Sequence, residues 1–427
     1  MIDIRILREH PELVKANCKR RGCPVDVDRL LADDAACLAL QRETEDLRAQ
    51  RNQLSRECRE KPEAREQVRD IKEKLAEKES ELNQLKGRLN RNLAWLPNLL
   101  ADDVPEGDGD QDNVPLRESG EKPVFDFAPA THEVIGERLG IIDTARGARV
   151  AQSGFYYWSG RGAQLASALF FWAQQELVKR GFKLFMTPCL AKEATLFGTG
   201  YLPFFQDQTY RLEGEDLSLI GTSEQTLVGY HAGETLPAQS LPLRYAAFSP
   251  CFRTEAGSYG KETRGIFRVH QFHKVEQIIF CRPADSPSFH AQCQENEEYL
   301  MQALGLHYQV VDICVGDLGA PGYKKYDIEA WFAGYGGYRE VASNTNLTDF
   351  QTRRLAIRCQ DQDGGRCFPH TISATAVTDR VVCAILEHYQ HADGSVSVPE
   401  VLRPLTGFDR IEPEPEQGNA EPAKSGA

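Results

Sequence analysis

The sequence predicts an α+β protein in which an antiparallel helical hairpin precedes a mostly antiparallel sheet flanked by helices. Two observations lead to this prediction. In the first hundred residues, apolar side chains recur at spacings of three and four, the period of a helix with one buried stripe. Further along, long helical patterns alternate with strand-like runs. Several of those runs follow one another without an intervening helix, so antiparallel pairing is expected.

Two amphipathic segments define the hairpin. The first covers residues 37–58 and the second covers residues 68–93. Lys61-Pro62-Glu63 separates them, and proline is tolerated at the start of a helix. We therefore expect a coiled coil over roughly residues 37–96, inside a helical domain that covers residues 1–105.

The hairpin differs in charge from the rest of the chain. Between Arg48 and Arg91 there are thirteen Lys or Arg and nine Asp or Glu, a local net charge of +4, whereas the whole chain carries −13. Such patterning is typical of a solvated coiled coil that serves as a spacer or a dimer contact. A second interpretation is an arm that contacts phosphates. Composition alone leaves both interpretations open.

Three further parts follow the helical domain. Residues 106–124 are expected to be a linker, because the segment is rich in Asp, Gly and Pro. Residues 125–410 form the second domain. The tail, residues 411–427, is rich in Pro, Glu, Gly and Ala and is expected to be disordered. Within the second domain, helices are expected at 162–180, 286–304 and 376–389, and strands at 309–315, 325–332 and 338–343.

Composition narrows the class of protein. With a pI of about 5.4, the bulk surface does not indicate nucleic-acid binding, so such binding needs a local basic patch. No run of about 18 apolar residues predicts a membrane span, and the start lacks the apolar core of a signal peptide. Twelve cysteines lie without C-x-x-C pairs. We expect reduced thiols in a cytoplasmic protein, and neither disulfides nor zinc.

The most informative segment is CFRTEAGSYGKETRGIFRVHQFHKVE, residues 251–276. Strand-like residues lie on both sides of it, so the pattern is strand, glycine-rich turn, strand. A glycine-rich backbone can approach a ligand closely, and guanidinium groups bind phosphates through two parallel hydrogen bonds. The segment is neither a P-loop nor a dinucleotide fingerprint. The turn contains Gly257 and Gly260, and the arginines of the segment are Arg253, Arg264 and Arg268.

Two clusters elsewhere carry hydroxyl and carboxylate groups. Thr222-Ser223-Glu224 follows a strand-like run and can hold a small ammonium group, although such a triplet is more often a helix N-cap. Glu340 and Ser343 offer hard oxygen ligands for Mg²⁺, or else a salt-bridge partner and a turn residue. Arg380 lies in a helix expected to begin near Ser373. Its guanidinium can stack on an adenine or meet a phosphate, or it is only solvated.

Long ordered stretches of the chain resemble the seryl-tRNA synthetases, which are class II aminoacyl-tRNA synthetases, and the resemblance covers about residues 2–407. Segment 251–276 is similar to motif 2 of that family, and LASALFFWAQQELVKRGFKLFMTP (165–188) is similar to its motif 1. The other matching stretches are FGTGYLPFFQDQTYRL (197–212), CVGDLGAPGYKKYDIEAWF (314–332), EVASNTNLTDFQTRR (340–354) and ILEHYQHADGSVSVPEVLRP (385–404).

The resemblance implies a fold and a reaction. The second domain is expected to be a class II catalytic domain, and the hairpin a tRNA-binding arm. L-serine and ATP with Mg²⁺ would give seryl-adenylate and pyrophosphate, and the seryl group would pass to tRNA(Ser), and to tRNA(Sec) where one exists. Motif 1 implies a homodimer. A synthetase-like enzyme that loads a non-tRNA acceptor and an inactive tRNA-binding homologue are the alternatives.

The resemblance also assigns residues, with Arg253 as the catalytic one. By this resemblance it would contact the reacting phosphate and the serine carboxylate. Glu340 and Ser343 would hold the Mg²⁺ bound to ATP. The residues implied for ATP are Arg253, Thr254, Glu255, Val269, Phe272, Glu340, Val341, Ala342, Ser343 and Arg380. The residues implied for serine are Thr222, Ser223, Glu224, Arg253, Glu276 and Thr375.

The third motif of the family differs in this chain. The family reads Asn-Gly-Ser-Gly-Leu-Ala-Val-Gly-Arg, where this chain reads Ile-Ser-Ala-Thr-Ala-Val-Thr-Asp-Arg over residues 372–380. Thr375 aligns best with the hydroxyl that contacts serine, and Ser373 is the alternative because of a one-residue gap. Asp379 stands where glycine is usual, and Gln225-Thr226 stands where Val-Pro is common.

Overall fold

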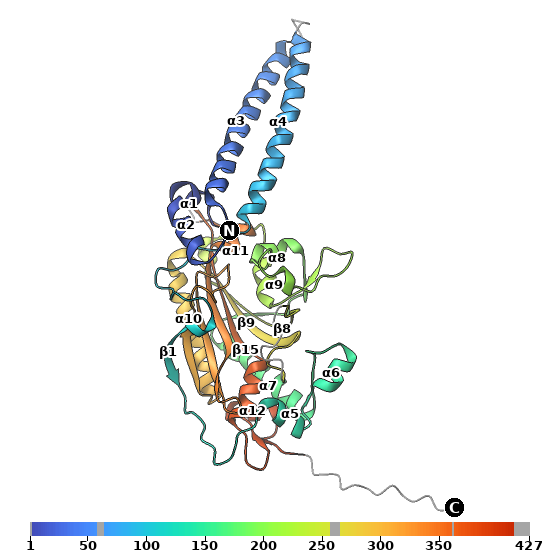
Figure 1. Ribbon diagram of the computed structural model, residues 1–427, viewed down its shortest axis with the longest axis vertical. Coiled ribbons are helices and arrows are strands. Elements are labelled where there is room, and N and C mark those ends of the chain that lie inside the picture. Colours follow the sequence, from blue (N-terminus) through green and yellow to red (C-terminus); the bar gives the residue numbers. More distant parts are fainter. Residues whose placement is uncertain (1, 58–63, 257–264, 361–362, 414–427) are drawn as a thin grey trace, which may run out of the picture. The chain divides into compact units, whose positions relative to one another are not determined.

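The computed structural model describes residues 2–57, 64–256, 265–360 and 363–413 (Figure 1). The expected helix boundary at 61–63 and the residues Gly257, Gly260 and Arg264 lie outside this part of the chain, as does the expected tail from residue 414 onward. The chain separates into two compact units, Met1–Leu99 and Leu100–Ala427. Each unit is described by itself.

The first unit is helical, as expected. It consists of α1 (Ile4–Glu9), α2 (Pro11–Arg20), α3 (Val27–Glu57) and α4 (Ala64–Leu93). The long helices α3 and α4 run side by side as an antiparallel pair (Figure 1). Leucines at helical spacing in α4, among them Leu82 and Leu89, pack against Leu30 and Leu40 of α3. The helical hairpin is therefore confirmed.

Two nearly buried carboxylates fasten the base of the hairpin. Asp33 accepts from both Nε and Nη2 of Arg88, at 3.0 and 2.8 Å, across the two long helices. Asp34 accepts in the same two-pronged manner from Arg8 of α1, at 2.7 and 2.8 Å. The hydrogen bonds from Arg88 lower the pKa of Asp33. Paired guanidinium bonds fix geometry as well as charge, so α1, α3 and α4 are held in one arrangement.

An eight-stranded sheet dominates the second unit, in the order β1-β10-β11-β12-β15-β9-β8-β4. Every neighbouring pair is antiparallel except β4 and β8, which confirms the mostly antiparallel expectation. The strands are β1 (Val114–Ser119), β4 (Lys183–Phe185), β8 (Leu243–Phe252), β9 (Gln271–Cys281), β10 (Tyr308–Asp312), β11 (Lys324–Phe332), β12 (Gly337–Thr348) and β15 (His370–Thr378).

Long helices cover one face of this sheet. Helix α7 (Gly160–Lys179) packs on β8, β9 and β15, and α10 (Ser286–Ala303) packs on β12 and β15 (Figure 1). The main core lies between these layers and includes Leu169, Leu300, Ile279 and Ala374. Because successive side chains of a strand point to opposite faces, the alternate positions of β9, β11, β12 and β15 face away from these helices. Those positions include the polar residues Lys274, Glu276, Lys325, Ser343, Ser373 and Thr375.

Shorter elements surround the sheet. The helices are α5 (His132–Arg138), α6 (Thr144–Val150), α8 (Glu193–Thr199), α9 (Ser223–Gly229), α11 (Phe350–Arg354), α12 (Asp379–His388) and α13 (Arg403–Thr406). The strands are β2 (Ile142–Asp143), β3 (Tyr157–Trp158), β5 (Leu190–Ala191), β6 (Ser218–Leu219), β7 (Thr235–Pro237), β13 (Arg358–Gln360), β14 (Arg366–Cys367), β16 (Val396–Ser397) and β17 (Arg410–Ile411). None of the helices in the described ranges combines the length and the apolar character that a membrane crossing needs.

Two boundaries differ from the sequence prediction. The helix expected to begin near Ser373 begins at Asp379, because Ser373 and the residues up to Thr378 form β15, which lies between β12 and β9 and is buried on both faces. Thr378 then caps the helix by accepting from the Arg380 N–H. The range 106–124, expected to be a linker, contains β1, which pairs with β10 at the sheet edge.

The expectation that every cysteine is a reduced thiol is wrong for one pair. Cys359 on β13 and Cys367 on β14 face each other across the two strands and form a disulfide. Directly opposed positions on neighbouring strands lie within reach of each other, and the sequence separation of 8 gave no motif to recognise. The other nine cysteines of the described residues are free thiols, and Cys58 lies outside this part.

Candidate active site

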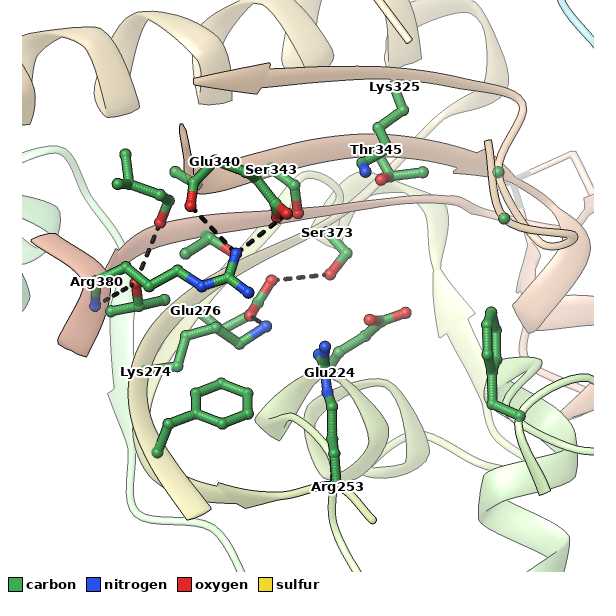
Figure 2. A pocket seen from close by; sticks show the side chains of 18 of the residues that line it. Glu224, Arg253, Lys274, Glu276, Lys325, Glu340, Ser343, Thr345, Ser373 and Arg380 are labelled. Atoms are coloured by element: carbon green, nitrogen blue, oxygen red, sulfur yellow. Dashed lines mark hydrogen bonds and ion pairs between the residues drawn. The ribbon is translucent and has the colours of Figure 1, made fainter. Parts of the chain in front are cut away.

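A cavity of about 370 Å³ opens over the polar face of the central strands (Figure 2). Side chains from β9, β11, β12 and β15 form its floor, and the beginning of α9 and the end of β8 form its sides. The register of the strands explains why these side chains lie together. Thr375 lies opposite Glu276, and Ser373 lies opposite Thr345, so all four side chains share one face.

Glu276 is the most constrained group of the cavity. It is 2% exposed, and Oε1 accepts from the Ser373 hydroxyl at 3.0 Å. Oε2 accepts from the Thr222 hydroxyl at 3.2 Å and forms an ion pair with Lys274, two residues earlier on β9. A buried carboxylate needs such partners. The side chain is therefore held in place by three different elements.

Glu224 supplies a second carboxylate beside the first. It lies in the first turn of α9, where the Thr222 side chain caps the helix by accepting from the Glu224 N–H at 3.2 Å. Oε1 of Glu224 accepts from Gln351 of α11 at 2.6 Å. Burial and the neighbouring Glu276 raise the pKa of Glu224 to about 7, against the opposing effect of Lys274. Two adjacent carboxylates form an acidic end of the cavity that suits a small cation.

The opposite end of the cavity is built around Glu340 and Arg380. The Arg380 Nη1 donates to the Glu340 carboxylate and to its backbone carbonyl, both at 3.1 Å. The same guanidinium lies over the Phe267 ring, 4.4 Å from its centroid. Burial would raise the pKa of Glu340, but Arg380 and Lys325 outweigh it and lower the value to about 2. Glu340 is therefore ionised at neutral pH.

Arg253 stands between the two ends. It follows β8, and its guanidinium lies 5.2 Å from the centroid of the Phe272 ring. Figure 2 shows it reaching across the cavity toward Glu224 and Glu276. Within the described residues, no hydrogen bond or ion pair engages this guanidinium. A fixed positive fork without a protein acceptor is available to a negatively charged ligand.

The segment after Arg253 contains backbone strain. Glu255 has a φ of +49°, a left-handed conformation that non-glycine residues adopt at a cost and that is frequent at ligand sites. Its Oε2 accepts from Arg268 Nε at 2.6 Å. The two residues close the side of the cavity near Val269.

Comparison with known proteins agrees with this geometry. Residues 1–100 match the seryl-tRNA synthetase N-terminal domain, and residues 208–389 match the tRNA synthetase class II core domain (G, H, P, S and T). The serine–tRNA ligase of Rubrobacter xylanophilus is 43% identical over 423 residues, which cover 97% of this chain and 99% of that protein. The chain belongs to the seryl-tRNA synthetases.

Two solved seryl-tRNA synthetase structures share the fold over nearly the full length. The enzyme of Pyrococcus horikoshii complexed with ATP has a TM-score of 0.92 and 39% identity, and the match covers 97% of this chain and 100% of that one. The cytoplasmic enzyme of Naegleria fowleri in complex with AMP has a TM-score of 0.87 and 32% identity, covering 97% and 99%. The class II catalytic fold expected from the sequence is thus confirmed.

Most residues that the sequence assigned to the seryl-tRNA synthetase site line the one cavity. These are Glu224, Arg253, Glu255, Val269, Phe272, Glu276, Glu340, Val341, Ala342, Ser343, Thr375 and Arg380. Three do not. Thr222 lies behind Glu276, and the buried Ser223 hydroxyl has no hydrogen-bond partner among the described residues. Thr254 turns away, because its hydroxyl donates to the Asp207 carbonyl.

Sequence reasoning missed several side chains of the cavity region, among them Lys274, Lys325, Phe267 and Gln351. Lys274 was detectable, because a position two residues before Glu276 on a strand shares its face. By the same rule, Lys325 on β11 shares the face of Asp327, with which it forms an ion pair at 2.9 Å. Phe267 and Gln351 gave no local signal, since their contacts to Arg380 and Glu224 join segments far apart in the sequence.

Two of the residues expected from the sequence to depart from the family pattern have structural partners here. Asp379 is 1% exposed, and its carboxylate accepts from Trp158 Nε1 at 2.8 Å and from the His273 N–H at 2.5 Å. The Asp379 carboxylate therefore connects α12 to β3 and β9 through hydrogen bonds. Gln225 accepts from the Gly221 N–H at 3.1 Å, which supports the turn before Thr222.

Proposed function

We propose that this chain activates L-serine with ATP and transfers the seryl group to tRNA(Ser), and to tRNA(Sec) where one is present. The observation that carries the proposal is the polarity of one cavity, which has an acidic end at Glu224 and Glu276, Arg253 in the middle, and Glu340 with Arg380 at the other end (Figure 2). An amino acid and a nucleotide triphosphate need these features in this order. Membership of the family supplies the reaction.

Serine would bind at the acidic end. Glu224 would accept from its ammonium group, and Glu276 would accept from its side-chain hydroxyl. Alanine in the same place would leave the Glu276 carboxylate short of a donor, and a polar site rejects a substrate that lacks the expected hydroxyl strongly. Thr375 lies opposite Glu276 on the same face and would contact the same hydroxyl. Thr222 and Ser223 would support this pocket from behind.

ATP would bind at the other end. Phe272 and Arg380 offer the two faces of a slot for the adenine ring, and Glu255 and the backbone around Val269 would contact its edge, with Thr254 holding this segment in position. Glu340 and Ser343 would hold Mg²⁺, since both oxygen donors line the cavity and the Glu340 carboxylate is ionised. Val341 and Ala342 join these two residues. The described residues contain no cluster of three His, Cys, Asp or Glu side chains for a metal of their own.

The first step joins the serine carboxylate to the α-phosphorus of ATP, and the bond to pyrophosphate breaks. Negative charge increases on the α-phosphoryl oxygens as the fifth bond forms. Arg253 faces this position and offers donors that are already oriented, so stabilisation grows in the transition state without reorganisation. Bound Mg²⁺ would neutralise charge on the phosphates. In the second step, a terminal ribose hydroxyl of tRNA attacks the seryl carbonyl, and AMP leaves.

The helical hairpin would contact the tRNA. We assign residues 1–105 to tRNA binding, with the arm at about 37–96, residues 125–410 to catalysis, and residues 106–124 to their connection through β1. The net charge of +4 between Arg48 and Arg91 supports phosphate contacts. We also propose a homodimer through the motif 1 region, 165–188, and a cytoplasmic enzyme, since its substrates are those of translation.

The test is purified protein with ATP, Mg²⁺ and serine. We expect serine-dependent exchange of labelled pyrophosphate into ATP, followed by charging of tRNA(Ser). Threonine, alanine and cysteine serve as competitors, and exchange with any of them above serine would reassign the substrate. Exchange without tRNA charging, but with transfer to another acceptor, would favour a carrier-loading enzyme. Binding of tRNA without any exchange would favour an inactive homologue.

A further inference from the structure

Gln351 is a fully buried amide that touches the serine end of the cavity from outside it. It lies on the short helix α11 and is 0% exposed. Its Nε2 donates to Glu224 Oε1 at 2.6 Å and to the backbone carbonyl of Thr199 at 3.0 Å. Its Oε1 accepts from the Thr371 hydroxyl at 2.8 Å. A buried amide whose three hydrogen bonds are all 3.0 Å or shorter is rigidly placed.

The orientation of this amide follows from its neighbours. The nitrogen and oxygen of a glutamine are similar in shape, so the partners must decide between them. The Thr199 carbonyl can only accept a hydrogen bond. The atom beside it must therefore be the nitrogen, and the same nitrogen faces Glu224. Gln351 can only donate to that carboxylate, and the oxygen is left to Thr371.

This donor acts on a carboxylate in a crowded electrostatic setting. Glu276 and Lys274 face Glu224 from β9, and Tyr201 and Arg253 lie close on the remaining sides. Burial and Glu276 favour the protonated form of Glu224, whereas Lys274, the Gln351 amide and the Ser373 hydroxyl favour the carboxylate. A donor at 2.6 Å stabilises the ionised form more than the neutral one.

Gln351 also connects four elements of the fold. Thr199 ends α8, Glu224 lies in the first turn of α9, and Thr371 lies on β15 two residues before Ser373. Gln351 binds Oε1 of Glu224, and Glu224 lines the cavity, so we expect its Oε2 to meet the ligand. The rotamer of Glu224 is thus set from behind by a side chain that does not line the cavity.

We propose that Gln351 is a positioning residue for amino-acid recognition, which holds Glu224 in the one rotamer that accepts the α-ammonium group. The proposal rests on the assignment of the acidic end to serine. Loss of Gln351 should therefore weaken the binding of serine and leave the binding of ATP unchanged. A variant that only weakened the fold would instead affect both substrates.

The test is Gln351→Met, which keeps the length of the side chain and removes both polar atoms. We expect the KM for serine in pyrophosphate exchange to rise about tenfold, with the KM for ATP within about twofold of wild type. The acidic limb of kcat/KM for serine should move up by about one pH unit, since an ionised group has lost a donor. Gln351→Glu should weaken serine binding further at high pH, where two carboxylates meet.

Two additional variants separate positioning from folding. Thr371→Val removes only the donor that fixes the amide, and should give a smaller change of the same kind. Thr352→Val is the matched control, because Thr352 is equally buried on α11 but donates to the Pro369 and Asp349 carbonyls; it should leave both KM values and the pH profile unchanged. If the wild-type protein showed no serine-dependent pyrophosphate exchange, the proposed function itself would be wrong. Active wild type with an unmoved pH profile in Gln351→Met, or equal rises in both KM values, would overturn the positioning role alone.

Discussion

The Ser373 hydroxyl donates to the Glu276 carboxylate at 3.0 Å, from one central strand to its neighbour. The carboxylate proposed to recognise the hydroxyl of serine thus already binds a hydroxyl of the protein. Thr375, on the same face of β15, forms no side-chain hydrogen bond among the described residues. Ser373 and Thr375 were the alternatives for the serine contact. Because, of the two, only the Ser373 hydroxyl is already hydrogen-bonded to Glu276, substitutions at the two positions should have different effects.

Replacing Thr375 by valine should weaken serine recognition without disturbing Glu276. Valine keeps the shape of threonine and loses the hydroxyl, so we expect kcat/KM for serine to fall about tenfold, the equivalent of one hydrogen bond. Pyrophosphate exchange measures this. Ser373→Ala should mainly lower stability, by about 1–3 kcal/mol, because a buried carboxylate loses a donor. The reverse pattern would make Ser373 the residue that contacts serine.

Arg253→Lys should remove most of the activation rate while leaving tRNA binding intact. Lysine keeps the positive charge but not the planar pair of donors. Loss of one preoriented donor for a transition state costs roughly 100- to 1000-fold in rate, which serine-dependent exchange will show. A gel-shift with tRNA(Ser) provides the control. Equal loss of exchange and tRNA affinity would contradict this division of roles.

Shortening the hairpin should separate the two steps. Arg48 of α3 pairs with Glu79 of α4 at 2.7 Å, so residues 47 and 80 can be joined by a short glycine–serine turn without changing the register. The shortened protein keeps the Asp33–Arg88 pair and Leu82, Leu85 and Leu89. We expect full pyrophosphate exchange and loss of tRNA(Ser) charging. Undiminished charging would show that the arm is only a spacer.

Stability should fall on mild acidification because of buried neutral histidines. Burial lowers the pKa of His290 to about 4, and its Nε2 donates to the Asn344 carbonyl at 3.1 Å. In the unfolded chain His290 becomes protonated near pH 6.5, whereas in the folded protein it stays neutral until the pH falls to about 4. The contribution of His290 is therefore complete above about pH 6.5 and is lost as the pH falls toward about 4, by up to about 3 kcal/mol.

Urea unfolding of His290→Gln at pH 7 and pH 5 measures this effect. Glutamine can keep a donor to Asn344 and does not titrate, so the variant should lose less stability than wild type between the two pH values. His391→Gln, at an exposed position, is the control and should follow wild type. An unchanged pH dependence in His290→Gln would assign the acid sensitivity to other groups.

The sequence predicted those features whose cause is local. The leucine spacing of α4 and the continuous apolar runs of the sheet fix their elements through a regular period. The start of α12 was misplaced because the Ala, Ser and Thr of residues 373–378 show no strong hydrophobic period. Pairing with β12 and β9 makes this segment a buried strand. The Cys359–Cys367 disulfide and the β1 edge strand depend on pairing with distant or opposed segments, which a single sequence does not reveal.

The same limit applies to the site. Residues of the contiguous segment 251–276 were found because their types and order suit a phosphate ligand. The Gln351–Glu224 contact spans 127 residues of sequence, and the Trp158–Asp379 contact spans 221. Such contacts arise only from the completed fold. Lys274 is different, because alternation along β9 was sufficient to place it beside Glu276.

Strand β9 carries Phe272 and Glu276 four positions apart on one face. At about 3.3 Å per residue, the strand sets these side chains about 13 Å apart along its axis. Strand β8 pairs with β9 over this whole stretch, and β15 pairs with it from Lys274 onward, so a one-residue insertion would turn half of its side chains to the opposite face. The site therefore cannot be lengthened along β9 to accept a longer amino acid. A change of specificity would instead require substitutions in α9 and α11, beside the serine end of the site.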